Sequence, residues 1–143
     1  MQFKDNHKAI IQDHYRNPRH KESFPEGQQG AVLDNPSCGD RVALRLVLEN
    51  KQIKELYFDG EGCSLSMASA SILTEMITGK TLEEAKANTT EILNIFNGKG
   101  SAEDLEERGD IGAFQALIEY PVRLKCATLA WETLNLLLEK QSF

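Results

Sequence analysis

The sequence predicts an α+β fold in which a small antiparallel three-stranded sheet packs against several helices. Apolar residues recur at helical spacing near the N-terminus and through the second half of the chain, and they alternate over residues 41–49. A short polar connector follows the alternating run, as in a hairpin. The element order is therefore helix, strands, helices, which is typical of an α+β domain. At 143 residues, the chain is expected to form a single domain, residues 1–143.

The first predicted helix lies in HKAIIQDHYRNP, where Ile10, Ile11, His14 and Tyr15 recur at helical spacing. Pro18 disfavours helical geometry at the residue before it, so the helix is expected to end there. Residues 21–30 contain two glycines and a proline and predict a turn-rich connection.

Three segments predict strands. GAVLD at residues 30–34 predicts an edge strand, residues 41–49 a regular strand and residues 52–59 a less regular one. Residues 49–51 are a connector short enough for an antiparallel hairpin. One face of the middle strand is predicted to carry Val42, Leu44, Leu46 and Leu48.

The second half of the chain predicts helices. Residues 64–79 end in a glycine stop signal, and Thr81 opens a capping box for a helix that continues to about Phe96. Residues 97–109 are acidic and contain glycines, so we expect an exposed connection. Asp110 is placed to cap a short helix.

Pro121 is expected to begin the last helix. Its predicted apolar face carries Cys126 together with Val122, Leu129, Ala130 and Leu137.

Composition excludes several classes of function. The net charge of −6 and the absence of a Lys/Arg-rich block argue against a nucleic-acid or anionic-membrane partner. The N-terminus has no apolar signal segment, and no apolar run is long enough to span a bilayer, so a cytoplasmic protein is expected. Three cysteines exclude a full disulfide framework and favour ligands, nucleophiles or inert core residues.

Each cysteine has a distinct local context. Cys38 lies in NPSCGD, a polar turn, and Cys63 follows two glycines at a predicted helix start, where the helix dipole stabilises a thiolate. Cys126 lies on the apolar face of the last helix. Any one of them taken alone is more often inert core, most clearly Cys126. The three placements together favour a shared site.

Three thiolates and the carboxylate of Asp40 form a ligand set that suits tetrahedral zinc. In an extended segment the side chains of Cys38 and Asp40 point the same way. The long spacings between the cysteines differ from those of a zinc finger, so the fold would have to gather the ligands. Three cations next to the ligands in sequence could offset the surplus negative charge, or could be solvated surface residues: Arg41, Arg123 and Lys125.

Four motifs together resemble the U-type iron–sulfur cluster assembly family, which comprises IscU, the NifU N-terminal domain and SufU. The motifs are DHYRNPR at 13–19, NPSCGD at 35–40, GEGCSLSMASAS at 60–71 and RLKCATLAW at 123–131. The resemblance covers nearly the whole chain and implies a SufE/NifU-like fold. Two details resemble SufU. Lys125 stands where IscU proteins carry a histidine, and residues 97–115 resemble the insertion typical of SufU.

The resemblance implies a zinc-dependent sulfur transfer protein in iron–sulfur cluster assembly. Cys38 would be the catalytic residue that accepts persulfide sulfur from a SufS-like cysteine desulfurase, and Cys38, Asp40, Cys63 and Cys126 would bind Zn²⁺. A histidine of the desulfurase would displace Cys38 from the metal. Other iron–sulfur assembly proteins are expected as further partners. Whether such a sulfurtransferase-like acceptor counts as an enzyme stays open.

Two alternatives remain at this point. The same ligands could hold a [2Fe–2S] cluster on a scaffold that passes it to acceptor proteins, although Lys125 in place of histidine favours sulfur transfer. A purely structural zinc site would need a closed pocket, which the polar loop around Cys38 does not suggest. His14 is expected to have a structural role or to lie on a partner surface.

Overall fold

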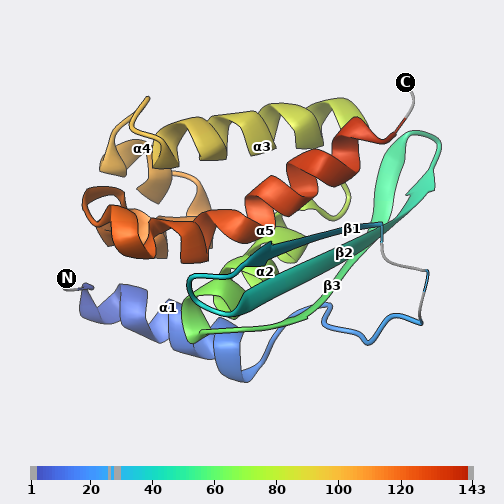
Figure 1. Cartoon of the computed structure of the whole chain (residues 1–143). Coiled ribbons are helices and arrows are strands. Elements are labelled where there is room, and N and C mark those ends of the chain that lie inside the picture. The colour runs from blue at the N-terminus through green and yellow to red at the C-terminus, as the bar shows by residue number, and fades with distance from the viewer. Residues whose placement is uncertain (1–2, 26, 28–29, 142–143) are drawn as a thin grey trace.

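Three antiparallel strands form one sheet, and helices cover the face that carries Val42 and Leu44 (Figure 1). The computed structural model describes residues 3–25, 27 and 30–141. The predicted α+β fold with a three-stranded antiparallel sheet is confirmed.

The N-terminal helix α1, Asp5–Arg16, ends two residues before Pro18, with Asn17 as its C-cap, so the predicted stop before the proline is confirmed. Its buried side chains are His7, Ile11 and His14, which lie on one helical face because they are four and three residues apart. This face packs against α2 and against the segment that precedes the last helix. The turn-rich connection expected at 21–30 includes residues 26, 28 and 29, which lie outside the described part of the chain.

The sheet has the order β1 (Ala31–Asn35), β2 (Asp40–Glu49) and β3 (Gln52–Glu61). The predicted hairpin between β2 and β3 is present, and both Asn50 and Lys51 have positive φ, 54° and 63°. Two successive residues of this kind give a turn whose twist matches that of the flanking strands.

The strong local signals give the expected helices. These are α2 (Ser64–Ile77), α3 (Leu82–Phe96) and α5 (Pro121–Glu139). The predicted capping box of α3 is complete, because the Glu84 N–H donates to Thr81 Oγ1 at 3.1 Å and the Thr81 N–H donates to Glu84 Oε1 at 3.0 Å. Two backbone groups at the helix start are thereby satisfied.

The segment between α3 and α5 differs from the prediction. A short helix, α4 (Ala102–Glu106), lies inside the expected exposed connection, and its Leu105 is fully buried. The predicted short helix is a 3₁₀ helix, η1 (Gly109–Glu119), and the expectation that Asp110 caps it is wrong, because Asp110 lies inside its first turn. Leu105 is the one buried residue of α4, and a single apolar residue carries no periodicity that a sequence pattern could reveal.

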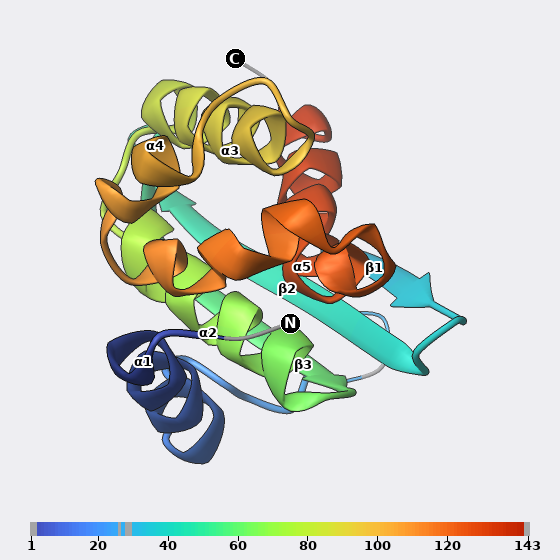
Figure 2. The same ribbon diagram turned by 90° about the vertical axis from the view of Figure 1, so that its left-hand side faces the viewer.

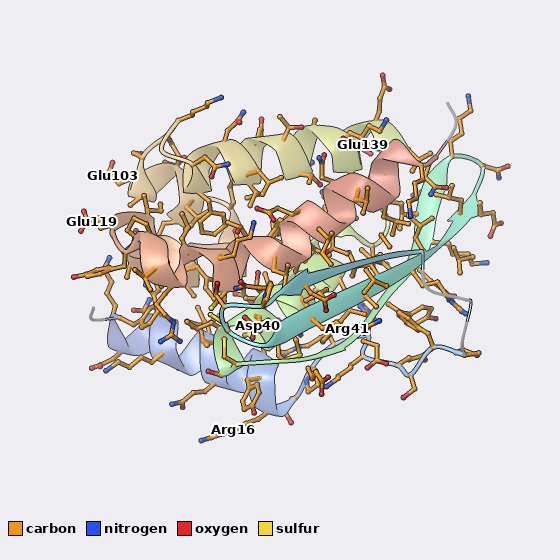
Figure 3. The ribbon with its side chains drawn as sticks, viewed as in Figure 1. Arg16, Asp40, Arg41, Glu103, Glu119 and Glu139 are labelled. Atoms are coloured by element: carbon orange, nitrogen blue, oxygen red, sulfur yellow. The ribbon has the colours of Figure 1, made fainter. Side chains whose placement is uncertain are left out.

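The expectation that Val122 is on the apolar face of the last helix is wrong, because its side chain is 86% exposed. The buried part of α5 begins only at Cys126. The first turn of α5 therefore projects beyond the core, at the end of the molecule where Cys38 and Asp40 lie (Figure 3).

α5 packs across β1 and β2, and α2 packs across β3 and against α5. Figure 2 shows α1 outside α2 and α3 beside α5. The apolar side chains between these layers form one continuous cluster around Phe58, Phe114 and Trp131. Among the described residues, no helix has the length and apolar character needed to cross a bilayer.

Candidate metal centre

The proposed ligands come from three elements that meet at one end of the sheet. Cys38 lies in the turn that joins β1 to β2, Asp40 is the first residue of β2, and Figure 3 shows Asp40 at this end of the hairpin. Cys63 is the N-cap residue of α2, and Cys126 lies in the second turn of α5.

Cys38, Asp40 and Cys126 form a compact set, because one ligand atom from each lies within 4.8 Å of the others. The Cys126 and Cys38 sulfurs are 3.7 Å apart. The chain thus brings together two thiols that are 88 residues apart in sequence.

Cys63 lies at the edge of this set rather than within it. Its backbone N–H donates to Asp40 Oδ1 at 2.9 Å, while its sulfur lies 4.0 Å from Asp40 Oδ2. The Asp40 carboxylate, only 1% exposed, therefore occupies the start of α2, where free N–H groups and the helix dipole favour an anion. Cys63 Sγ also lies 3.6 Å from Ser66 Oγ.

Two glycines allow these elements to approach. Gly62 has φ +152°, and a Cβ at this position would meet the Asp40 carboxylate and would lie 2.8 Å from Ser66 Oγ. Gly39, between Cys38 and Asp40, has φ +70° and open space around it. The first glycine permits the close contact, and the second permits the turn that orients Cys38 and Asp40.

The three thiols differ in accessibility. Cys38 is exposed, Cys63 is half-buried and Cys126 is buried. Burial, together with the smaller effects of neighbouring Cys63, Cys38 and Asp40, raises the pKa of Cys126 to about 12. Without a bound cation, Cys126 is therefore a neutral thiol at physiological pH.

Arg123 is the cation that faces the thiols. Its hydrogen bond to Cys126, together with the charges of Cys126 and Cys63, raises the pKa of its guanidinium. Lys125 instead donates to Glu132 Oε2 at 2.7 Å on the exposed side of α5. Arg41 is exposed and follows Asp40 in β2, so its side chain leaves the opposite face of the strand. Of the three cations considered from the sequence, only Arg123 contacts the cysteines in this way.

His14 lies away from these ligands. Its ring is 1% exposed and contacts Ser71 and Asp110. These contacts within the fold correspond to the structural role, one of the two roles considered for His14 from the sequence.

Comparison with known proteins gives the family of this chain. The family model described as NifU-like N terminal domain matches residues 6–127. This chain belongs to that family. The resemblance drawn from the four motifs is thereby confirmed.

Two curated relatives and one solved structure carry similar sequences. The zinc-dependent sulfurtransferase SufU of Bacillus subtilis (strain 168) is 40% identical over 131 residues, which cover 90% of this chain and 86% of that protein. The iron–sulfur cluster assembly scaffold protein IscU of Streptococcus pyogenes serotype M1 is 32% identical, with coverage of 89% and 79%. A crystal structure of a putative SUF-system scaffold protein from Fervidobacterium islandicum AW-1 has a TM-score of 0.75 and 32% identity, covering 90% of this chain and 93% of that one.

The structure adds residues to the site of this NifU-like domain that the motifs did not single out. Ser66 donates to the Cys63 carbonyl at 3.0 Å and lies beside its sulfur. Asn35 pairs with Asp40 across the β1–β2 turn, and its buried Nδ2 has no partner among the described residues. The hydroxyl three residues after the N-cap position was a usable signal for Ser66, whereas no local pattern singled out Asn35.

We expect Gly62→Ala to destabilise the NifU-like domain more than Gly79→Ala does. Both glycines have positive φ, 152° and 92°, but only the Gly62 methyl would push against Asp40. Overpacking of this kind costs about 1–3 kcal/mol. Urea denaturation of the metal-free variants measures the difference, and equal losses in the two variants would contradict the close contact.

The raised pKa of Cys126 predicts a dependence of stability on pH in the metal-free protein. Its folded-state value of about 12 exceeds the ordinary value of 9.0, so the neutral thiol favours the fold fully below pH 9. This contribution is lost as the pH rises through the window between these two values. Urea denaturation across that window should show a steeper loss for the parent protein than for Cys126→Ala. Parallel curves would show that Cys126 titrates normally.

Proposed function

We propose that this NifU-like domain is a zinc-dependent sulfur transfer protein of iron–sulfur cluster assembly. The observation that supports this most strongly is a compact ligand set in which the single exposed sulfur, Cys38, adjoins the buried Cys126 and Asp40. The buried members can hold a metal while the exposed member remains within reach of a partner.

The donor set fits zinc. Two thiolates on one tetrahedral zinc, each at about 2.3 Å from the metal, lie about 3.8 Å apart, and the Cys38 and Cys126 sulfurs are 3.7 Å apart. Asp40 is the third donor, and Cys63 reaches the set by a small change in its side chain from its position 4.0 Å from Asp40 Oδ2. Bound zinc would keep these thiols deprotonated at neutral pH.

Cys38 is the residue we propose as the sulfur acceptor. Its thiolate attacks the outer sulfur of a persulfide on the donor enzyme, a new S–S bond forms at Cys38, and the S–S bond of the donor breaks. The donor cysteine leaves as a thiolate with the electron pair, so the exchange needs no external oxidant or reductant. The positive φ of Gly39 and the open space around it suit a turn that carries Cys38 outward.

The partner we propose is a pyridoxal-phosphate-dependent cysteine desulfurase of the SufS type, because a protein persulfide is the sulfur source that this exchange requires. Other iron–sulfur assembly proteins would then receive the sulfur. Three unpaired cysteines suit a reducing compartment, and we place the protein in the cytoplasm.

A scaffold for a [2Fe–2S] cluster is the second candidate, supported by the clustering of three sulfurs and one carboxylate and by the similarity to proteins named as scaffolds. Lys125 weighs against it. Its amine is engaged with Glu132 and offers no ligand in the position where IscU carries a histidine.

To test sulfur transfer, the zinc-loaded protein is incubated with a cysteine desulfurase and cysteine, and intact-protein mass spectrometry follows. We expect a mass increase of one sulfur atom on Cys38 and faster desulfurase turnover. Cys38→Ala should bind sulfur at neither remaining cysteine, because these are half-buried and buried. A protein that leaves turnover unchanged, but forms a stable cluster with iron and sulfide, would support the scaffold function. Zinc retained without either activity would indicate a structural site.

Two cations of α5, Arg123 and Lys125, provide a matched pair of variants that tests whether positive charge near the thiols strengthens zinc binding. We expect Arg123→Gln to weaken zinc binding, because the guanidinium contacts Cys126 and offsets the charge of the thiolates. Lys125→Gln should leave zinc affinity unchanged, since the amine contacts Glu132. Competition with a chromogenic zinc chelator measures both affinities. An equal effect in the two variants would assign the loss to general surface charge.

A further inference from the structure

A second cluster of ligating side chains lies where α1, α2 and η1 meet. It consists of His14, Glu75 and Asp110, and one ligand atom from each lies within 4.8 Å of the others. Ser71, which contacts His14, is eight residues after Cys63 along α2, a separation of about 12 Å along the helix axis. The cluster is therefore separate from the thiols.

The histidine of this cluster is held in a fixed orientation. Its ring is 1% exposed, with Nδ1 at 2.8 Å from Ser71 Oγ and Nε2 at 2.9 Å from Asp110 Oδ2. Ser71 Oγ also accepts a hydrogen bond from the Arg19 backbone N–H at 2.9 Å, which fixes the hydroxyl. Metal-binding histidines are oriented in this way, with one nitrogen hydrogen-bonded to a neighbour and the other directed at the ligand site.

Arg19 lies among three carboxylates, and the hydrogen bond to Asp13, followed by the charges of Asp13, Glu75 and Asp110, raises its pKa. Three carboxylates against one guanidinium leave a surplus of negative charge, which favours a further cation. The contact of Arg19 with Asp13 is 2.6 Å, whereas that with Glu75 is 3.5 Å. Glu75 is the more loosely held partner and is half exposed, so it can turn toward a bound cation while Arg19 stays on Asp13.

We propose that His14, Glu75 and Asp110 form a second divalent-cation site, of the mixed nitrogen and oxygen type that accepts Mn²⁺ and Fe²⁺. One imidazole and two carboxylates suit these ions better than a thiolate pocket does, and water completes the coordination on the exposed side. The cation takes the place of the hydrogen bond between His14 Nε2 and Asp110, and the single N–H proton of the neutral ring then resides on Nδ1, with no proton released. The Nδ1–H then donates to Ser71 Oγ.

This site does not depend on the proposed sulfur transfer, and its test keeps the thiols occupied. The zinc-loaded protein is titrated with Mn²⁺, and electron paramagnetic resonance measures the free ion. We expect one bound Mn²⁺ per chain, with paramagnetic broadening of the His14 ring resonances. Glu75→Gln and Asp110→Asn should each weaken binding about tenfold or more. Both carboxylates are about half exposed, so the variants are expected to fold, which circular dichroism checks.

Glu91→Gln is the matched control. Glu91 is 53% exposed and pairs with Arg108, much as Glu75 is 51% exposed and pairs with Arg19, but it lies outside the cluster. Its loss should leave Mn²⁺ affinity unchanged. The proposal is overturned if the zinc-loaded protein binds no Mn²⁺, or if the Glu91 variant loses as much affinity as the two cluster variants.

Discussion

The contact between the Asp40 carboxylate and the backbone N–H of Cys63 is the constraint on which the thiol site depends. A carboxylate that is 1% exposed needs compensation, and the N-terminus of α2 supplies it through a hydrogen bond of 2.9 Å and the helix dipole. The same contact fixes the β1–β2 turn against α2. It thereby sets the distance between Cys38 and Cys63, which belong to those two elements.

The packing of α5 on the sheet supplies the remaining ligand. Cys126 is the first buried residue of that helix, at the boundary between its projecting first turn and the core. Because the thiol is buried, it is neutral until a cation binds, and Arg123 partly offsets the charge that then develops. Exposure increases from the buried Cys126 through the half-buried Cys63 to the exposed Cys38. The site therefore has a buried side that can hold a metal and an exposed thiol that a partner can reach, as the proposed sulfur transfer requires.

The two buried histidines of α1 connect the segment between α3 and α5 to the rest of the fold. His7 lies 3.0 Å from Glu106 in α4, and His14 lies 2.9 Å from Asp110 in η1. The segment between α3 and α5 is thus attached to α1 by polar contacts in addition to apolar ones such as Leu105. These contacts place a carboxylate and an imidazole next to each other at a position that is distant from the thiols.

The sequence alone determined the elements with strong local patterns and the residue types of the site. The alternation in β2, the capping box of α3 and the glycines around Cys38 and Cys63 all act over a few residues, so they are readable without tertiary information. The tertiary structure decided which groups meet. The contact between Cys38 and Cys126 spans 88 residues, and the choice of Arg123 over Lys125 depends on which side of α5 faces the sheet. Val122 is exposed because the elements that cover α5 do not extend to its first turn. The apolar periodicity within α5 cannot show where that cover ends.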